Sequence, residues 1–251
     1  MEFFDCNVFY GLSVAQSQML PVPTVGQLQT ALAEAGVAKA VVWRIEQHTG
    51  AMMTANRVLA EDIRGADNLY GTWSILPSHT HEMPAPDELP PLMKANRIIG
   101  WRLMPKMGRY FARAFVLGDY FKVAVERKIP VFISTAHGAR PEDLEDILKA
   151  FPQLTVVLTY ASDWPSDRAY RPFVKEWPNL HIDLSYCIGD AAIESFCQEY
   201  GPSRLLYGSN FPDCYFGGLM QMVRHAGIPI ADREAIAGGN LGRIVQEVRL
   251  D

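Results

Sequence analysis

The sequence predicts a (β/α)8 TIM barrel formed by one domain over residues 1–251. Short apolar runs rich in β-branched residues alternate along the chain with segments whose apolar residues repeat at helical spacing. The apolar runs are almost continuous, which is typical of parallel strands covered on both faces. Because eight such strand-then-helix units follow one another without a linker in 251 residues, the pattern indicates a closed barrel.

The expected strands differ in length but share bulky apolar residues. They cover residues 3–9, 40–43, 70–76, 98–103, 131–134, 156–159, 181–184 and 204–207. An open doubly wound sheet is the alternative, and it usually carries a glycine-rich phosphate turn after an early strand. Only a single glycine, Gly11, follows the first strand, so the sequence favours the barrel.

Three of the segments between strands carry helix signals. Thr24 is expected to cap a helix that Gly36 ends. Pro141 suits the first turn of a second helix, whose apolar stripe runs from Leu144. The same i, i+3, i+4, i+7 spacing begins at Leu241 near the end of the chain.

The composition excludes several function classes. With 23 Lys+Arg against 28 Asp+Glu, the net charge is −5, which argues against nucleic acid or an anionic membrane as a main partner. No run approaches the ~20 apolar residues of a membrane span, and residues 1–5 lack the basic region of a signal peptide. The four cysteines have no CxxC spacing, so we expect reduced thiols in a cytoplasmic protein.

In such a barrel, the functional side chains follow the carboxyl ends of the strands. The polar residues at these ends give eight candidates: Asn7, Arg44, Arg102, Ser134, Tyr160 and Asn210 for substrate binding, and His137 and Asp183 for catalysis. An arginine at the mouth can bind a carboxylate or phosphate through two parallel hydrogen bonds. The alternative for the arginines is an ion pair with Glu46 or Asp183.

The catalytic candidates also have alternatives. Asp183 either points into the barrel as a general base, pairs with Arg102, or faces outward beside a helix end. His137 forms an acid–base pair only if Asp163 or Asp213 lies next to it. Four histidines follow strands: His48, His79, His81 and His137. They are expected to be separate, solvated loop residues, and a relocated metal site is the alternative.

Four stretches of sequence carry a family resemblance. They are Phe-Asp-Cys-Asn-Val-Phe-Tyr-Gly at 4–11, Ile-Pro-Val-Phe-Ile at 129–133, Arg-Leu-Leu-Tyr-Gly-Ser-Asn-Phe-Pro at 204–212 and Gly-Asn-Leu-Gly-Arg-Ile at 239–244. In this order they resemble the amidohydrolase superfamily, in its amidohydrolase-related (amidohydrolase 2) branch. The resemblance implies an amidohydrolase-like barrel and hydrolase chemistry.

The resemblance also implies a metal site, which in that family polarises a water for attack on an ester or amide. The family's metal-binding positions fall here on Asn7, Phe9, Ser134, Tyr160 and Asn210. Phenylalanine cannot bind a metal, and the other side chains are neutral and poor ligands for zinc. The sequence therefore predicts that the metal mechanism is absent, and we expect no cofactor.

Three classes of function remain open from the sequence. The first is a metal-independent hydrolase of a small carboxylated lactone or ester. In it, Arg44 and Arg102 would hold the anion, and the neutral side chains at the metal positions would stabilise a developing oxyanion. The second is a catalytically inactive barrel that binds or senses a small anionic molecule. A structural subunit is a third class, and the family resemblance also suggests a homo-oligomer.

Overall fold

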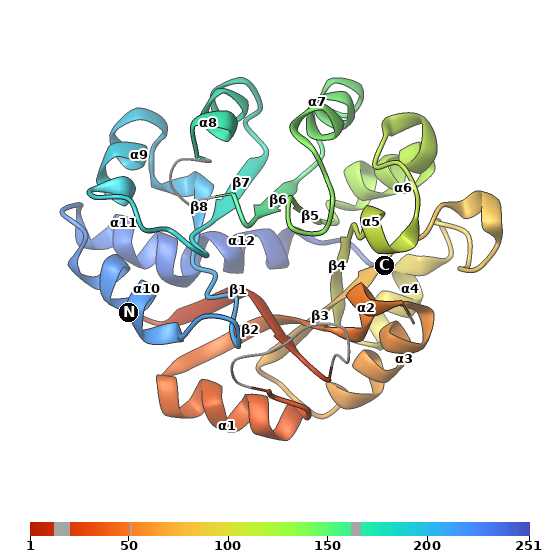
Figure 1. Cartoon of the computed structure of the whole chain (residues 1–251), viewed down its shortest axis with the longest axis horizontal. Coiled ribbons are helices and arrows are strands. Elements are labelled where there is room, and N and C mark those ends of the chain that lie inside the picture. Colours follow the sequence, from red (N-terminus) through yellow and green to blue (C-terminus); the bar gives the residue numbers. More distant parts are fainter. Residues whose placement is uncertain (13–20, 51, 162–166) are drawn as a thin grey trace.

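The computed structural model describes residues 1–12, 21–50, 52–161 and 167–251. Its eight strands pair in parallel in the order β1 to β8, with helices around the outside (Figure 1). This arrangement confirms the barrel that the sequence predicts.

The strands begin within three residues of their expected positions. They are β1 Phe3–Tyr10, β2 Val37–Arg44, β3 Leu69–Ser74, β4 Ile98–Arg102, β5 Val131–Ser134, β6 Val156–Thr159, β7 Leu180–Asp183 and β8 Leu205–Leu206. Because β8 has only two residues, most of the predicted run at 204–207 lies outside the regular ladder.

In the described residues, one or more helices follow each strand. The first six are α1 Val25–Ala35, α2 Glu46–Thr49, α3 Met52–Asp62, α4 Leu89–Ala95, α5 Pro105–Gly108 and α6 Ala114–Arg127. The next six are α7 Pro141–Ala150, α8 Asp167–Glu176, α9 Ala192–Tyr200, α10 Phe216–His225, α11 Ile230–Glu234 and α12 Asn240–Glu247. Short 3-10 turns lie at Ser78–Thr80 and Pro202–Arg204, and a π turn at Ala235–Gly239 precedes α12.

The predicted helix ends are confirmed at α1 and α7. The Thr24 side chain accepts a hydrogen bond from the Gln27 amide, and Gly36 ends α1 with a φ of 75°. A residue with a Cβ atom is disfavoured in that left-handed conformation, so glycine suits the position. Pro141 occupies the first turn of α7, where its missing N–H costs no hydrogen bond.

The chain beyond β8 closes the barrel against β1. Three backbone hydrogen bonds of 2.9 Å form this seam: Cys6 N to Tyr207 O, Phe9 N to Phe211 O and Asn210 N to Asn7 O. Closure therefore depends on residues after β8 as well as on the two residues of the strand itself.

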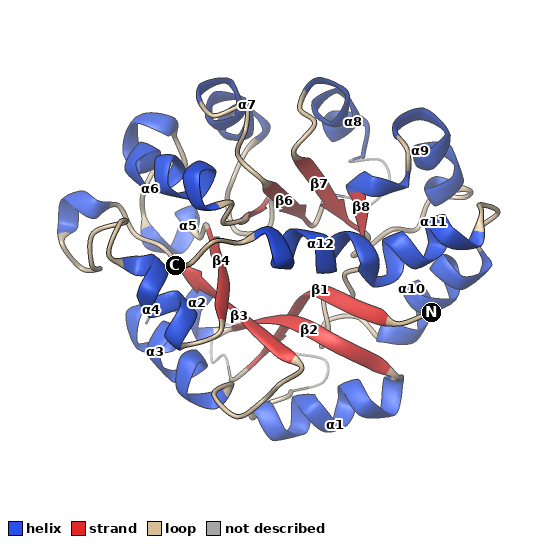
Figure 2. Ribbon diagram, turned by 180° about the vertical axis from the view of Figure 1, so that it is seen from behind, coloured by secondary structure: helices blue, strands red, loops and turns tan. Residues whose placement is uncertain are grey.

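Apolar side chains fill the amino-terminal end of the barrel. Helix α12 covers this end (Figure 2). Leu241 and Ile244 of α12 pack on an inner cluster of buried side chains from six strands: Phe4, Cys6, Val41, Ile99, Phe132, Val157 and Leu206. The described helices include none that is both long and apolar enough to cross a membrane. Since this end is plugged, access to the barrel interior is from the carboxyl ends of the strands.

Candidate functional site

Asn7 lies at the centre of the barrel mouth. One extra residue of β1 stands between the pairs Asp5–Ala40 and Val8–Val42, which is a β-bulge at this point of the strand. The buried Asn7 side chain donates from Nδ2 to Asp183 Oδ2 at 3.2 Å and to Asn210 Oδ1 at 3.4 Å. Its Oδ1 accepts a hydrogen bond from Trp43 Nε1 at 3.1 Å. One amide thus links β1, β2, β7 and the segment after β8.

A second chain of hydrogen bonds joins the ends of β6, β7 and β8. Tyr160 donates from its hydroxyl to Asn210 Oδ1, and Asn210 donates from Nδ2 to the Tyr186 hydroxyl at 3.0 Å. All three residues have left-handed backbones, with φ of 61° at Tyr160, 61° at Tyr186 and 56° at Asn210. Such conformations cost about 1–3 kcal/mol each and gather at functional sites. The surrounding contacts therefore hold these side chains in place against local backbone preference.

We expect Tyr160→Phe to lower the free energy of unfolding by about 1 kcal/mol, because the variant loses the hydroxyl that Asn210 accepts from. Urea denaturation followed by circular dichroism measures the change. Tyr215→Phe is the matched control, since that ring is 71% exposed. A loss no larger than that of the control would show that the hydrogen bond contributes nothing.

Two fully buried carboxyl groups lie beside this network. Asp183 accepts hydrogen bonds from Ser185 Oγ, 2.8 Å from each oxygen, and from Asn7. Asp5 accepts from the backbone amides of Asn7 and Ser209, both at 3.0 Å. Burial raises the pKa of each carboxyl to about 7, although their hydrogen bonds act in the opposite direction. Either group can exchange a proton near neutral pH.

Arg102 places a buried charge beneath the mouth. It is the last residue of β4 and is fully buried, and its Nε donates to Thr72 Oγ1 at 3.3 Å. Both terminal guanidinium nitrogens lack a hydrogen-bond partner within the described ranges. The guanidinium carbon lies 5.1 Å from the Trp43 ring centre and 4.9 Å from that of Phe132. Burial lowers its pKa to about 10, so the side chain stays charged at neutral pH.

A cavity of about 320 Å³ opens above this network. Most of its walls are aromatic or imidazole rings, and the lining consists of Phe9, Trp43, Ile45, His48, Ala136, His137, Tyr160, Tyr186 and Asp213. The His137 ring, 4% exposed, lies 5.2 Å from Trp43, 4.5 Å from His48 and 5.5 Å from Tyr160, measured between ring centres. Flat walls of this kind suit a flat ligand.

Both cavity histidines have lowered pKa values. Burial lowers the pKa of His137 well below its ordinary value, and the charges of His48 and Arg102 lower it further. Burial and the Lys106 charge lower the pKa of His48. In both rings, Nδ1 is buried and has no partner among the residues that the structure describes. The pair therefore has hydrogen-bonding capacity that the described residues leave unused.

The remaining candidates are placed as follows. Ser134 Oγ accepts from the His137 backbone amide at 3.3 Å and so supports the cavity wall. Arg44 is bound by two carboxylates, Glu46 at 2.7 Å and Asp62 at 2.6 Å. The ion pair with Glu46, one alternative in the sequence, is therefore present. The structure joins Asn7, Asp183, Tyr160 and Asn210 by hydrogen bonds, sets Arg102 and His137 next to them, and directs Arg44 elsewhere.

The alternatives for the other titratable residues are partly resolved. Asp213 lines the same cavity as His137, while Asp163 lies outside the described residues. His79 and His81 are exposed, so of the four loop histidines only His48 and His137 lie together. Across the described ranges, no group of three or more His, Cys, Asp or Glu is arranged to hold a metal ion.

Sequence reasoning missed Trp43, Asp5 and the pairing of His48 with His137. Strand alternation could have identified Trp43, because neighbouring residues of β2 point to opposite sides and Arg44 points away from the barrel interior. No pattern in the sequence brings His48 to His137, because the two residues follow different strands.

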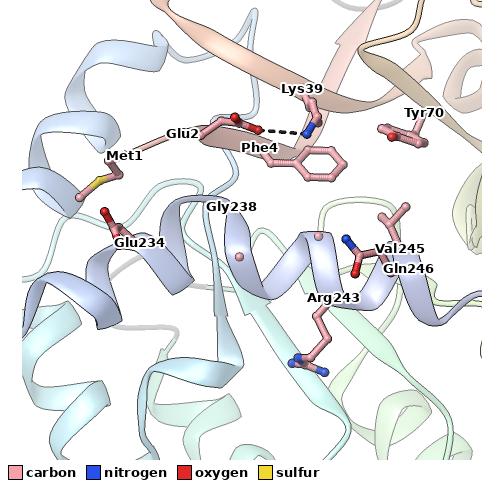
Figure 3. A pocket seen from close by; sticks show the side chains of 12 residues that line it. Met1, Glu2, Phe4, Lys39, Tyr70, Glu234, Gly238, Arg243, Val245 and Gln246 are labelled. Carbon is pink, nitrogen blue, oxygen red and sulfur yellow. Dashed lines mark hydrogen bonds and ion pairs between the residues drawn. The ribbon is translucent and has the colours of Figure 1, made fainter.

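A larger cavity of about 480 Å³ lies at the opposite end of the barrel, between the start of β1 and α12 (Figure 3). Glu2 and Lys39 on its wall form an ion pair of 3.0 Å. Residues at this amino-terminal end serve stability in such barrels, whereas those at the carboxyl-terminal end serve function. We therefore place the candidate site in the smaller cavity at the mouth.

Comparison with known proteins gives a family and a fold. The sequence model of the family described as Amidohydrolase matches residues 15–244. No curated protein matches the sequence.

Solved structures match over nearly the whole chain. One is 5-carboxyvanillate decarboxylase from Sphingomonas paucimobilis, with 14% identity, a TM-score of 0.70, and coverage of 98% of this chain and 99% of that one. A second is a probable 2-pyrone-4,6-dicarboxylic acid hydrolase from Acinetobacter baumannii with citric acid bound, with 17% identity, a TM-score of 0.72, and coverage of 98% and 100%. A third is a dihydroxybenzoic acid decarboxylase from Polaromonas sp. JS666 with bound manganese and the inhibitor 2-nitroresorcinol, with 12% identity, a TM-score of 0.73, and coverage of 98% and 97%. At these identities the likeness supports the fold alone.

Proposed function

The chain belongs to the amidohydrolase family, and we propose that within it this protein binds a small, planar carboxylate without a metal ion. One observation carries the proposal. The fully buried Arg102 guanidinium has two terminal nitrogens without a partner in the part of the chain that the structure describes, and it lies beneath the Trp43 wall of an aromatic cavity. Asp183 acts on this charge from a distance, but no described carboxylate hydrogen-bonds to it, so a ligand carboxylate is a favourable partner.

The residues at the family's metal positions do not fit a catalytic metal. Asn7, Tyr160 and Asn210 are neutral and bond to one another, Ser134 supports the His137 backbone, and Phe9 packs on Trp43. Zinc needs about three ligands from His, Cys or carboxylate groups. The charge of Arg102 would also repel a cation. These contacts support a metal-independent site.

The class of ligand follows from the cavity walls. Trp43, His137, Tyr160 and Tyr186 offer ring faces around a volume of about 320 Å³, which suits a molecule with one ring. The named substrates of the neighbouring structures, a carboxyvanillate, a dihydroxybenzoic acid and a pyrone dicarboxylic acid, are also ring acids. Arg44 is not part of the proposed site, because Glu46 and Asp62 already bind it.

Hydrolysis of a carboxylated lactone or ester is the second candidate function, and the Asp183 carboxyl favours it. Its pKa of about 7 suits a general base at neutral pH. In that reaction, water adds to the carbonyl carbon while Asp183 accepts a proton. The ring C–O bond then breaks, and the proton returns to the leaving oxygen. His137 would contact the reacting ester, and Tyr160 and Asn210 would orient it.

Calorimetric titration with benzoate, 2-hydroxybenzoate and a 2-pyrone carboxylate, in buffer with and without EDTA, tests the proposal. We expect the ring acids to bind with the same affinity in both buffers, and elemental analysis to find no stoichiometric metal. Binding that disappears in EDTA and returns with manganese or zinc would overturn metal independence. Release of acid from the pyrone in EDTA would identify the hydrolase, and binding without release would identify an inactive binding barrel.

Two further expectations accompany this function. The four cysteines are free thiols, which suits the reducing cytoplasm. We expect a small anionic molecule as the ligand, no nucleic acid or membrane as a partner, and a homo-oligomer as the assembly.

A further inference from the structure

A groove lies on the outside of the barrel, between α3 and α4 and over the outer face of β3. The two helices lie side by side in both ribbon views (Figures 1 and 2), and the groove has a volume of about 430 Å³. Helix α4 has only seven residues, and the segment before it contains Pro77, Pro84 and Pro86. The helix layer therefore covers β3 incompletely. Among the described residues, none lines both this groove and the cavity at the mouth.

The walls of the groove are mainly apolar. Six side chains form them: Met53 and Ala60 from α3, Trp73 from β3, Met83 from the segment before α4, and Leu89 and Leu92 from α4. Trp73 donates from Nε1 to the Asn56 carbonyl at 3.1 Å, so its polar atom is satisfied and its ring is fixed in the wall. Methionine side chains are unbranched and adapt to the shape of an apolar ligand. The groove therefore suits a flexible hydrocarbon chain.

The two ends of the groove differ in charge. Because α3 follows β2 and leads back to the start of β3, Met53 lies toward the mouth, and Arg64, just beyond α3, lies toward the opposite end. Asn96, at the end of α4, lines the groove at the same end as Arg64. Arg57 is paired with Glu61, whereas within the described ranges the Arg64 side chain takes part in neither an ion pair nor a hydrogen bond. One end is thus apolar, and the other has a cation open to a ligand.

The residues of α3 also give the groove its length. Met53, Arg57 and Glu61 recur every four residues, so they lie in one row along the helix. Eight residues of α-helix rise about 12 Å. A row of this length, apolar at one end and cationic at the other, matches an alkyl chain that carries one acid group.

We propose that the α3–α4 groove binds a single-chain alkyl carboxylate, whose chain lies on Trp73 and whose acid group meets Arg64. The chain removes the exposed Leu92 side chain and the methionines from water, and the carboxylate pairs with the free guanidinium. This inference goes beyond the proposed function and does not rest on it, because the walls and the cation of the groove are separate from those of the mouth.

Calorimetry on the whole protein with hexanoate, octanoate and decanoate, below the concentrations at which they form micelles, tests the apolar bed. Burial of one CH2 group changes an affinity by up to about fourfold, and an open groove covers only part of each group. We therefore expect the affinity to rise at least threefold with each two added CH2 groups. Equal affinities for the three acids, or no binding of decanoate, would overturn the inference.

Variants assign the binding to the groove. Leu92→Glu should weaken the binding of decanoate at least tenfold, because it places a negative charge on the apolar bed, while Ile230→Glu, at an exposed position of α11, should leave it unchanged. Arg64→Gln should remove the preference for decanoate over decan-1-ol, and Arg249→Gln, at an exposed position outside the groove, should keep it. An affinity that survives Leu92→Glu, or a preference that survives Arg64→Gln, would overturn the proposed placement.

A bromine atom at the end of the chain locates that end, since bromine quenches the fluorescence of a tryptophan in contact with it. We expect 10-bromodecanoate to quench the protein, Trp73→Phe to abolish this quenching, and Trp43→Phe to keep it. Trp43 lines the cavity at the mouth. Quenching that depends on Trp43 and not on Trp73 would therefore place the chain at the mouth and overturn this inference alone, without touching the binding of ring acids.

Discussion

Arg102→Met should make the protein more stable and abolish its binding of ring carboxylates. Replacing buried charged groups with well-packed apolar side chains of similar volume is often stabilising by about 1–4 kcal/mol, and Arg102 has no carboxylate partner among the described residues. Methionine can fill the space between Trp43 and Phe132 without a charge. We therefore expect a higher free energy of unfolding together with a loss of affinity of at least a hundredfold. Urea denaturation and calorimetry on the same preparation measure the two effects.

The matched control for this substitution is Arg57→Met. Arg57 is an exposed residue of α3 that pairs with Glu61 one helical turn away, and such pairs contribute about 0.3–0.5 kcal/mol. We expect its stability and affinity to stay near those of the unchanged protein. If Arg102→Met instead destabilised the protein by several kcal/mol and kept its affinity, the arginine would be a structural residue balanced by Asp183 and Asp5.

Asp5→Asn should stabilise the protein more as the pH rises. Burial raises the pKa of Asp5 from 3.8 to about 7 in the folded protein. Below pH 4 the carboxyl is protonated in the folded and the unfolded chain, so it has no pH-linked effect. Between pH 4 and 7 the unfolded chain releases the proton while the folded chain retains it, so stability falls as the pH rises. Above pH 7 the folded protein bears the whole cost of the buried charge.

Asparagine removes this cost and keeps an oxygen for the Asn7 and Ser209 amides. The difference in unfolding free energy between the variant and the unchanged protein should grow by about 3 kcal/mol from pH 5 to pH 8. Urea denaturation at each pH gives that difference. The lowered pKa values of buried His137 and His181 make stability rise with pH, opposite to the effect of Asp5, but they do so in both proteins and therefore cancel in the difference. Asp67→Asn, at an exposed position, is the control. A difference that stays constant with pH would contradict the assignment of a neutral buried carboxyl.

The fold could be predicted because its signals are local. The runs at 131–134 and 156–159 became strands with the expected bounds, and the cap at Thr24, the stop at Gly36 and the first turn at Pro141 appear as their chemistry requires. The strand at 204–207 was expected to be longer than β8, because the chain leaves the ladder there to form the seam with β1. Such a departure depends on a partner about 200 residues away.

The site could be predicted only in part. The rule that function follows the strand ends selected Asn7, Tyr160, Asp183 and Asn210, which the structure joins by hydrogen bonds. The same rule selected Arg44, whose side chain turns to Glu46 and Asp62 because Trp43 takes the inward position on β2. The contact between His48 and His137 arises when two loops meet, and neither loop contains a signal for the other.

The closure of the barrel after β8 determines when the site can exist. Asn7 and Asn210 are separated by 203 residues, and the backbone hydrogen bond between them belongs to the same seam as their side-chain contact. A chain in which the segment after β8 has not yet folded has neither the seam nor the candidate site. The candidate site therefore forms only when β1 and the segment after β8 have folded against each other.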